Sequence, residues 1–469
     1  MSEGLDGTIS IGLAAAVVFT AAAHGAVETW SRLAFEGIVF GLALLWTVKM
    51  FRDKRFRVAI PGVALPLSAL ILVCAAQSIR VTDSGGNSHS LSMDVHATRS
   101  TLLMLLTLLV ALLLGATFLE GRRTLTVWAG FLAIFGLAMA VFALVQNFTW
   151  NGHFYWVGPT PESVVGTDAS PFGSFANRNH FAGYMELLVP VPAALVVTGG
   201  VRGEARLFFG FAAIMMGVST VASLSRGGLL SLAGAIVFIA VLSFVVPRTR
   251  SARVKPQGPA GRSHLWTRIG VVAGIATAIA LGTVWIGSRA VTDRLSETFA
   301  DITGSDPQAD FTTHRRWIWR NTVSMIREHP IAGVGMGAYA KAYPAYSQND
   351  AARVFSYAHN DYLQLLADCG AVGGVIAVWF LISVFSSLRR ALKARDPFLA
   401  GLAIGAGASI LALLIHSLVD YNLQIPSTAL LFLLLAGIAS NLGESSSAGT
   451  QTSRVRLSQQ EYSYERGNN

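Results

Sequence analysis

Residues 101–119 read TLLMLLTLLVALLLGATFL, an unbroken apolar run without a charged residue. A helix needs about 17 to 25 apolar residues to cross the hydrocarbon core of a bilayer, so this run is long enough. Similar runs recur along almost the whole chain, which has 469 residues, 53% of them hydrophobic and only 13% charged. Such a composition excludes a water-soluble globular protein. We therefore predict an all-α polytopic integral membrane protein, with residues 1–469 forming a single membrane domain.

The apolar runs predict twelve membrane-spanning helices. They cover residues 8–23, 33–51, 58–79, 101–119, 124–146, 181–198, 205–224, 228–246, 269–287, 371–388, 398–416 and 427–442. The loops on one side of this arrangement carry pairs and clusters of basic residues, such as Arg122 with Arg123 and Arg389 with Arg390. Because basic loops stay in the cytoplasm, this side is predicted to be cytoplasmic.

The predicted orientation places both termini in the cytoplasm and makes the first span a retained helix, because no basic segment precedes it as in a signal peptide. In a Gram-negative bacterium the protein would lie in the inner (cytoplasmic) membrane. The basic stretch 248–268 falls on the cytoplasmic side, and the large loop 289–370 faces the periplasm. The polar tail 443–469 is expected to be cytoplasmic and disordered.

Several arginines are expected on the outer side, against the charge rule. They are Arg178, Arg226, Arg315, Arg316, Arg320 and Arg327. An anionic ligand would explain them, and the alternative is ordinary surface solvation beside acids such as Asp310. Their position beside the motifs below favours a ligand.

The first motif, FGSFANRNHFAGY at residues 172–184, runs directly into the sixth predicted span. The start of a helix leaves backbone N–H groups that could hold an anion or a sugar hydroxyl. This makes Asn177, Asn179 and His180 candidate substrate-binding residues. The alternative for Asn177, which the residue type alone favours, is that it caps the helix.

Two further motifs place charged or titratable residues beside membrane spans. LSRGG at residues 224–228 puts Arg226 in a very short turn, where an arginine at membrane depth is a functional candidate unless it reaches to the interface. HNDYLQLLADCG at residues 359–370 predicts a short amphipathic helix leading to the tenth span, with His359 at its start. A lone histidine is more often structural than catalytic. The glycines of GVGMG at residues 333–337 lack the lysine of a phosphate-binding loop.

Taken together and in order, these motifs resemble the O-antigen ligase and Wzy polysaccharide polymerase superfamily. The resemblance rests on NRNHFA at 177–182, SRG at 225–227, Arg315 with Trp319, HP at 329–330 with GVG at 333–335, HNDYLQ at 359–364 and HSLVDY at 416–421. It therefore extends from the sixth span to the last.

The resemblance implies a membrane glycosyltransferase that moves a glycan from an undecaprenyl-diphosphate donor to an acceptor hydroxyl on the periplasmic face. By position, Arg226 and Arg315 match the diphosphate-binding arginines, and His359 matches the general base. Arg315 is preferred to Arg316 because the family places this arginine four residues before a tryptophan, here Trp319. Arg316 and Asn360 remain candidate substrate-binding residues, whereas Asp368, which stands where many members have glutamate, receives no role.

The chemistry agrees with these assignments. The departing diphosphate needs cations to stabilise its negative charge, and where no metal is bound the guanidinium groups of arginines supply them. A neutral histidine can remove the proton of the acceptor hydroxyl near neutral pH. Because the sequence has no Asp-x-Asp pair suited to a divalent cation, we expect metal-independent and cofactor-independent transfer. Attack from one side would invert the anomeric carbon. The two cysteines match no metal or redox motif and exclude a disulfide framework.

The expected partners are the lipid bilayer, the undecaprenyl-diphosphate-linked glycan donor, and a glycan or lipid A core acceptor, with no nucleic acid. Lipopolysaccharide and exopolysaccharide biosynthesis are both open, because a ligase and a polymerase differ only in the acceptor. A multi-span transporter of small anions such as bicarbonate is an alternative of another class. A peptidoglycan glycosyltransferase of similar architecture lacks the loop signature.

Overall fold

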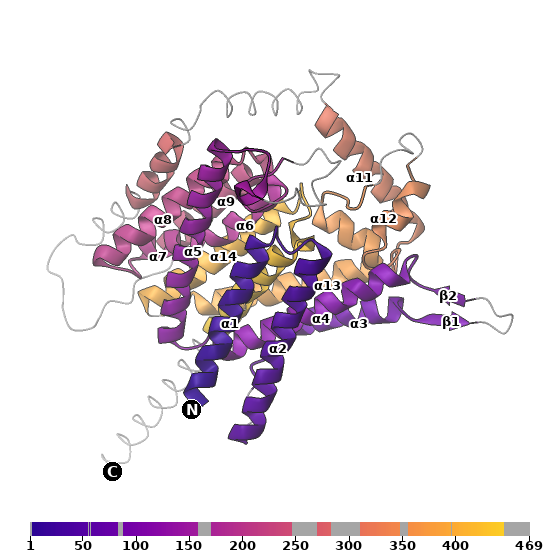
Figure 1. The fold of residues 1–469 in the computed structure, drawn as a ribbon, viewed down its shortest axis with the longest axis horizontal. Coiled ribbons are helices and arrows are strands. Elements are labelled where there is room, and N and C mark those ends of the chain that lie inside the picture. The colour runs from indigo at the N-terminus through magenta and orange to yellow at the C-terminus, as the bar shows by residue number, and fades with distance from the viewer. Residues whose placement is uncertain are drawn as a thin grey trace, which may run out of the picture.

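The computed structural model describes residues 2–54, 56, 58–82, 88–157, 170–245, 270–282, 310–347, 355–394 and 396–444. Within these residues the chain is a bundle of helices with one small β-hairpin (Figure 1). This confirms the predicted all-α polytopic class. The basic stretch 248–268 and the tail beyond residue 444 lie outside the described residues, as does 289–309, the first part of the large outer loop.

Ten helices in the described part of the chain are long and apolar enough to cross a membrane. They are α1 (Ser2–Ala22), α2 (Thr29–Asp53), α4 (Val95–Phe118), α5 (Arg122–Phe148), α6 (Arg178–Leu188) continued by α7 (Pro190–Thr198), α8 (Gly203–Ala222), α9 (Arg226–Val245), α13 (Asp361–Ala391), α14 (Pro397–His416) and the last helix, Pro426–Glu444. The third and ninth predicted spans fall on two shorter apolar helices, α3 (Ala64–Gln77) and Gly270–Gly282. Every predicted run thus overlaps a helix, while the count of twelve crossings stays a prediction.

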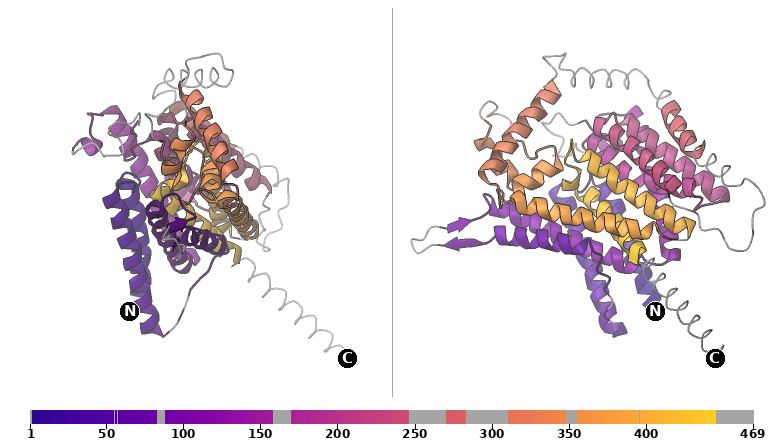
Figure 2. Two further views of the ribbon diagram at one scale, coloured as in Figure 1. Left: turned by 90° about the vertical axis from the view of Figure 1, so that its right-hand side faces the viewer. Right: turned by 180° about the vertical axis from the view of Figure 1, so that it is seen from behind.

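The centre of the bundle is the α6–α7 segment, which is buried from His180 to Thr198. Pro190 has no N–H to donate, so the helical ladder is interrupted there and α7 begins as a new helix. α14 packs against α6, α7 and α9, and the last helix is almost as deeply buried as α6 and α7. By contrast, α1 and α2 form a layer along one side of the bundle (Figure 2, left).

The loops predicted to share one side of the membrane meet at the same end of the bundle. At one end Arg122 forms an ion pair with Asp396 at 2.5 Å. At the other end the backbone N–H of Ser427 donates to the carbonyl of Gly25 at 3.1 Å. These two contacts agree with the predicted alternation for the loops that they join, and the assignment of the basic end to the cytoplasm stays a prediction.

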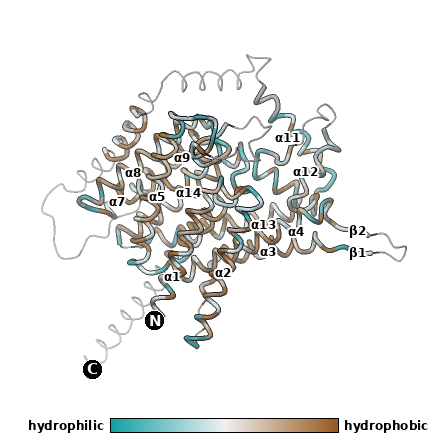
Figure 3. The backbone as a smooth tube through the Cα atoms, viewed as in Figure 1, coloured by the Kyte–Doolittle hydropathy of each residue, from teal (hydrophilic) through white to brown (hydrophobic). Residues whose placement is uncertain are grey.

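The segment that follows residue 309 packs as a small helical unit with its own hydrophobic cluster. It contains α11 (Asp310–Glu328), α12 (Tyr339–Ala342) and the 3₁₀ helix η2 (Tyr343–Ala345). Ile318, Thr322 and Met325 recur at helical spacing and are buried, which makes one face of α11 apolar. Figure 3 shows more hydrophilic colour on α11 and α12 than on the bundle helices.

Four minor elements complete the description: the 3₁₀ helices η1 (Phe154–Trp156) and η3 (Asn422–Gln424), and the antiparallel strands β1 (Arg80–Thr82) and β2 (Ser88–Ser90). The strands were not expected from the sequence. They project beyond the helices at one edge of the molecule (Figure 2, right).

Candidate functional site

The predicted site residues gather where three helices begin. α6 starts at Arg178, α9 at Arg226 and α13 at Asp361. The first turns of α6 and α9 touch, because a side chain added at Gly228 would lie 2.8 Å from the methyl group of Ala182. The first N–H groups of a helix lack partners within it and carry positive partial charge. Three helix starts at one place favour an anion there.

A short turn between α14 and η3, residues 417–420, connects the elements of the site. The backbone N–H of Asp361 donates to the carbonyls of Ser417 at 2.9 Å and Asp420 at 3.2 Å. The hydroxyl of Ser417 donates to Oδ2 of Asp361 at 2.8 Å. These bonds hold the start of α13 against the 417–420 turn.

Backbone carbonyls of the same turn accept hydrogen bonds from two predicted site residues. Arg315 of α11 donates from Nη1 to the carbonyl of Val419. Asn360 donates from Nδ2 to the carbonyl of Leu418 at 2.8 Å, while its Oδ1 accepts from the first N–H groups of α13. Asn360 is therefore the N-cap of α13 and fixes the turn, and its role as a substrate contact stays a prediction.

Asp420 is the centre of the charged cluster. Its side chain is 1% exposed, with Oδ2 3.7 Å from Nη2 of Arg315 and Oδ1 3.7 Å from Nδ1 of His359. Burial alone would raise the pKa of Asp420, but the adjacent imidazole of His359 and the charge of Arg315 lower that pKa well below its usual range. Asp420 is thus a buried anion between the two residues. Asp420 belongs to the motif HSLVDY at residues 416–421, but its residue type and position alone predicted no role for it.

His359 has an unusual backbone conformation, with φ at +49°, where a residue with a side chain is strained. Such a conformation costs about 1–3 kcal/mol and persists only where neighbours hold it. The preceding residue is held on both sides: Trp319 donates from its indole to the carbonyl of Ala358 at 3.0 Å, and the N–H of Ala358 donates to Gln364 at 2.8 Å. The His359 side chain remains 28% exposed, so substrate can reach it.

Arg226 and Arg315 come from different helices and lie close enough to influence each other. The side chain of Arg315 is 14% exposed, and burial is the main cause that lowers its pKa. The negative charge of Asp420 opposes this shift, whereas the positive charge of Arg226 adds to it. Arg316, the next residue on α11, is exposed. Of the two adjacent arginines, Arg315 is the one that faces the 417–420 turn.

The first motif contributes mainly structure. Oδ1 of Asn177 accepts from the N–H of Asn179 at 2.8 Å and caps α6, as the capping interpretation predicts. Asn179 lies partly exposed in the first turn. His180 is buried and packs its ring against Tyr421, with 4.9 Å between the ring centroids. The ring of His359 contacts Tyr421 at the same distance of 4.9 Å, so Tyr421 links the first motif to the charged cluster.

The glycine-rich segment also has a structural task. Gly333, Gly335 and Gly337 all have positive φ, and a side chain at Gly335 would collide with Ser92. The N–H of Gly335 donates to the carbonyl of Asp368 at 3.0 Å. α13 has a non-helical residue at Gly370, so the short amphipathic helix predicted before the tenth span is present and joins the span there.

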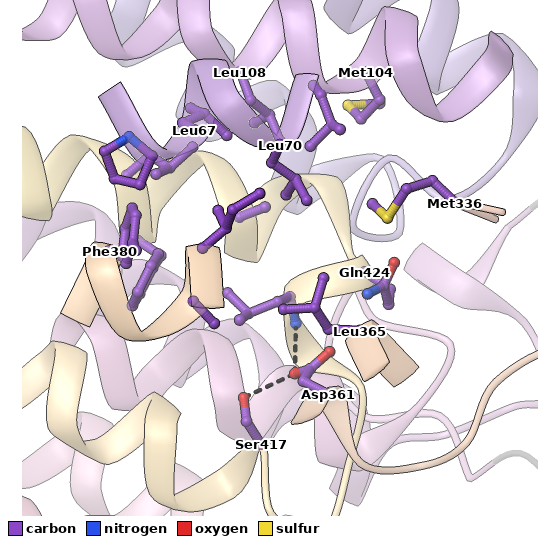
Figure 4. A pocket seen from close by; sticks show the side chains of 18 of the residues that line it. Leu67, Leu70, Met104, Leu108, Met336, Asp361, Leu365, Phe380, Ser417 and Gln424 are labelled. Atoms are coloured by element: carbon purple, nitrogen blue, oxygen red, sulfur yellow. Dashed lines mark hydrogen bonds between the residues drawn. The ribbon is translucent and has the colours of Figure 1, made fainter. Parts of the chain in front are cut away.

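An apolar cavity of about 250 Å³ is lined in part by Asp361 and by Ser417, the first residue of the 417–420 turn (Figure 4). It is bounded by α3, α4, α13, α14 and the last helix, and its wall includes Leu67, Leu70, Met104, Leu108, Leu365 and Phe380. Its polar end consists of Asp361, Ser417 and Gln424. The cavity therefore ends at the same 417–420 turn that holds Arg315.

Comparison with protein families gives one match. Residues 211–378, about a third of the chain, match the family model described as O-antigen ligase. No individual curated protein matches the chain. The matched region contains Arg226, Arg315 and His359, whereas α6 and the 417–420 turn lie outside it. Residues 211–378 thus match an O-antigen ligase domain, which supports the resemblance to the O-antigen ligase and Wzy polymerase superfamily and, in general terms, a glycosyltransferase of that type. The ten membrane-length helices of the described residues indicate a multi-pass membrane protein.

Proposed function

We propose that the protein transfers a glycan from a polyprenyl-diphosphate-linked donor, such as undecaprenyl diphosphate, to an acceptor hydroxyl at the end of the bundle that holds the 417–420 turn. The observation that carries this proposal is the grouping of Arg226, Arg315, Asp420 and His359 beside an apolar cavity. In a Gram-negative cell this end would face the periplasm, and the donor and acceptor would both be lipid-linked molecules of the inner membrane.

The arginines are suited to the diphosphate. A guanidinium presents parallel N–H donors that match two phosphate oxygens, and it keeps its charge when partly buried. Arg226 also lies at the start of α9, where the helix dipole adds positive potential. These cations would stabilise the negative charge that develops on the leaving diphosphate, so this chain's own residues suffice for that step without a metal ion.

The cavity is suited to the hydrocarbon part of the donor. Its wall is apolar and lies among membrane helices, while its polar end reaches the turn that contacts Arg315. A polyprenyl diphosphate has the same polarity, an apolar chain attached to an anionic head. We therefore place the diphosphate at Arg226 and Arg315, and the part of the hydrocarbon chain nearest to it in the cavity.

His359 is proposed as the general base. With Nδ1 facing Asp420, Nε2 is the nitrogen left to accept the proton of the acceptor hydroxyl. The acceptor oxygen then bonds to the anomeric carbon as the bond from that carbon to the diphosphate breaks. Asp420 holds the ring orientation and stabilises the imidazolium that forms. Attack opposite the leaving group inverts the anomeric configuration.

Ligation and polymerisation share this chemistry and differ only in the acceptor, so the proposal covers both, with lipopolysaccharide and exopolysaccharide as the corresponding products. The family match favours transfer over the alternative of a small-anion transporter. The arrangement of a base, a buried acid and two arginines at one end of the bundle also serves a group transfer better than passage across the membrane.

The test uses purified protein in liposomes with a lipid-linked glycan donor. Arg226→Lys and Arg315→Lys keep the positive charge but lose the pair of parallel N–H donors of the guanidinium group. Each should reduce the transfer rate by about 10²- to 10³-fold. The double variant should be little worse than either single one, because groups that act as a unit are not additive. Arg202→Lys and Arg389→Lys, which change exposed arginines at the opposite end of the bundle, serve as controls. Near-normal transfer by both Arg226→Lys and Arg315→Lys would refute the proposed clamp.

A further inference from the structure

A second pair of titratable residues lies deeper in the bundle, outside the proposed reaction. Nδ1 of His416 on α14 is 3.0 Å from Oε1 and 3.2 Å from Oε2 of Glu186 on α6. The side chains are 1% and 0% exposed. Glu186 is six residues after His180, or about 9 Å further along the helix axis.

Such a pair is costly to bury, because both groups lose their hydration and their mutual attraction seldom repays the loss. Ionisable residues inside membrane segments therefore indicate a task. Packing alone does not require this pair, since α6 and α14 are already joined by apolar contacts and by a hydrogen bond from Ser409 to the carbonyl of Leu187 at 2.8 Å.

The pair contacts the two residues that follow Arg226. A side chain at Gly227 would lie 2.4 Å from Cδ2 and 2.5 Å from Nε2 of His416. One at Gly228 would lie 3.3 Å from Oε1 of Glu186. The first turn of α9 therefore rests directly on the imidazole and the carboxylate, and a displacement of His416 would move the backbone that carries Arg226.

The pair also supports the 417–420 turn. The carbonyl of His416 accepts from the N–H groups of Val419 at 2.9 Å and Asp420 at 3.0 Å. The carbonyl of Val419 in turn accepts a hydrogen bond from Arg315, and the carboxylate of Asp420 lies 3.7 Å from the guanidinium group of Arg315. One side of His416 therefore meets the Arg226 segment, and its backbone begins the segment that holds Arg315.

We propose that Glu186 and His416 are positioning residues that set the spacing between Arg226 and Arg315. By fixing the imidazole between α6 and α9, Glu186 holds both arginine-bearing segments at the separation that a diphosphate requires. The inference rests on the proposed function, because the spacing matters only if the two arginines grip one ligand.

The experiment compares Glu186→Gln and Glu186→Ala with Ser409→Ala, which removes a different buried α6–α14 hydrogen bond. In the liposome assay, kcat/KM for the donor should fall by about 10- to 100-fold in Glu186→Ala, the scale expected when a clamp is misplaced by about 1 Å. Glu186→Gln, which can still accept one hydrogen bond from the imidazole, should lie between Glu186→Ala and the wild type. KM for the acceptor should not change, and Ser409→Ala should show wild-type kinetics.

A double-mutant cycle separates positioning from a general loss of structure. If Glu186 acts through Arg226, Glu186→Gln should have little further effect in an Arg226→Lys background. His416→Gln should reproduce the donor-specific defect and decides the matter if the Glu186 variants do not insert. Wild-type donor kinetics in either pair variant, or a full additional loss in the Arg226→Lys background, would overturn the inference. Normal activity of Arg226→Lys itself would instead remove the clamp on which the inference rests.

Discussion

The change Asp420→Asn removes one negative charge from the centre of the site while keeping the size of the side chain. Asp420 lies 3.7 Å from both Arg315 and His359, so the change has two opposite effects. It removes the carboxylate that would stabilise a protonated His359. It also removes an anion that competes with the donor diphosphate for Arg315. We therefore expect kcat to fall while KM for the donor stays equal or decreases.

The size of the effect follows from the distance. Two unit charges at the 3.7 Å between His359 and Asp420 attract by about 4.5 kcal/mol at an effective dielectric constant of about 20. The imidazole is 28% exposed, and its charge is only partly developed in the transition state, so roughly half of this energy applies. About 2 kcal/mol corresponds to a decrease in kcat of about 30-fold.

The assay measures initial transfer rates of reconstituted protein over a range of donor concentrations, at matched protein levels. Asp368→Asn provides the control, because Asp368 is an equally buried carboxylate whose hydrogen bonds are to Gln364 and a backbone N–H. Its kcat should stay near the wild-type value. An Asp420→Asn protein with wild-type kcat, or one whose only defect is a raised KM for the donor, would refute the proposed role of Asp420 at the base.

The depressed pKa of Asp420 gives an internal check on this variant. A carboxyl group whose folded pKa is lowered stabilises the fold fully above its unfolded pKa of about 4, and this contribution is lost as pH falls through the folded pKa. The difference in Tm between the wild type and Asp420→Asn should therefore shrink as the pH falls below about 4.

Three other outcomes are expected. His359→Ala should abolish transfer in protein that still inserts, with accumulation of lipid-linked donor in cells, and activity in proportion to protein level would exclude a general base at His359. Transfer should continue in excess EDTA, whereas a loss that magnesium or manganese restores would show a metal requirement. In whole cells a membrane-impermeant thiol reagent should label a cysteine placed at the exposed Ser356 but not one at Ala394, because the two positions are predicted to lie on opposite sides of the membrane. The native Cys74 and Cys369 are buried and should add little background labelling. The reverse pattern would invert the predicted orientation.

Much of the fold was predictable because membrane spans leave a strong signal in sequence. All twelve apolar runs overlap helices. The helix expected after His359 begins at Asp361, directly after its N-cap residue Asn360. Less predictable were the boundaries where local chemistry overrides hydropathy. The third run extends over 58–79, but its helix covers only Ala64–Gln77. The sixth run is divided at Pro190, whose missing N–H splits it into α6 and α7.

The candidate site was predictable only in part. Motif order identified Arg226, Arg315 and His359 within the family-matched region, and the tryptophan spacing selected Arg315, which faces the turn, over Arg316. Asp420 was within reach of sequence reasoning, as a lone acid in the short outer loop between the last two spans. Glu186 gave a similar signal as a carboxylate inside an apolar run, but its partner on α14 is 230 residues away and only the fold brings the two together.

The 417–420 turn shows why the remaining part has no sequence signal. Leu418 and Val419 are apolar residues, and neither would be selected as part of a polar site. Their contribution is made by backbone carbonyls, which every residue type carries: Leu418 accepts from Asn360, and Val419 accepts from Arg315. Carbonyls act at the site only because the loop is short and begins where α14 ends. The location of this turn is thus set by the length of the loop and by the helix pair that anchors it. The geometry of the candidate site therefore depends on packing deep in the bundle as much as on its polar residues.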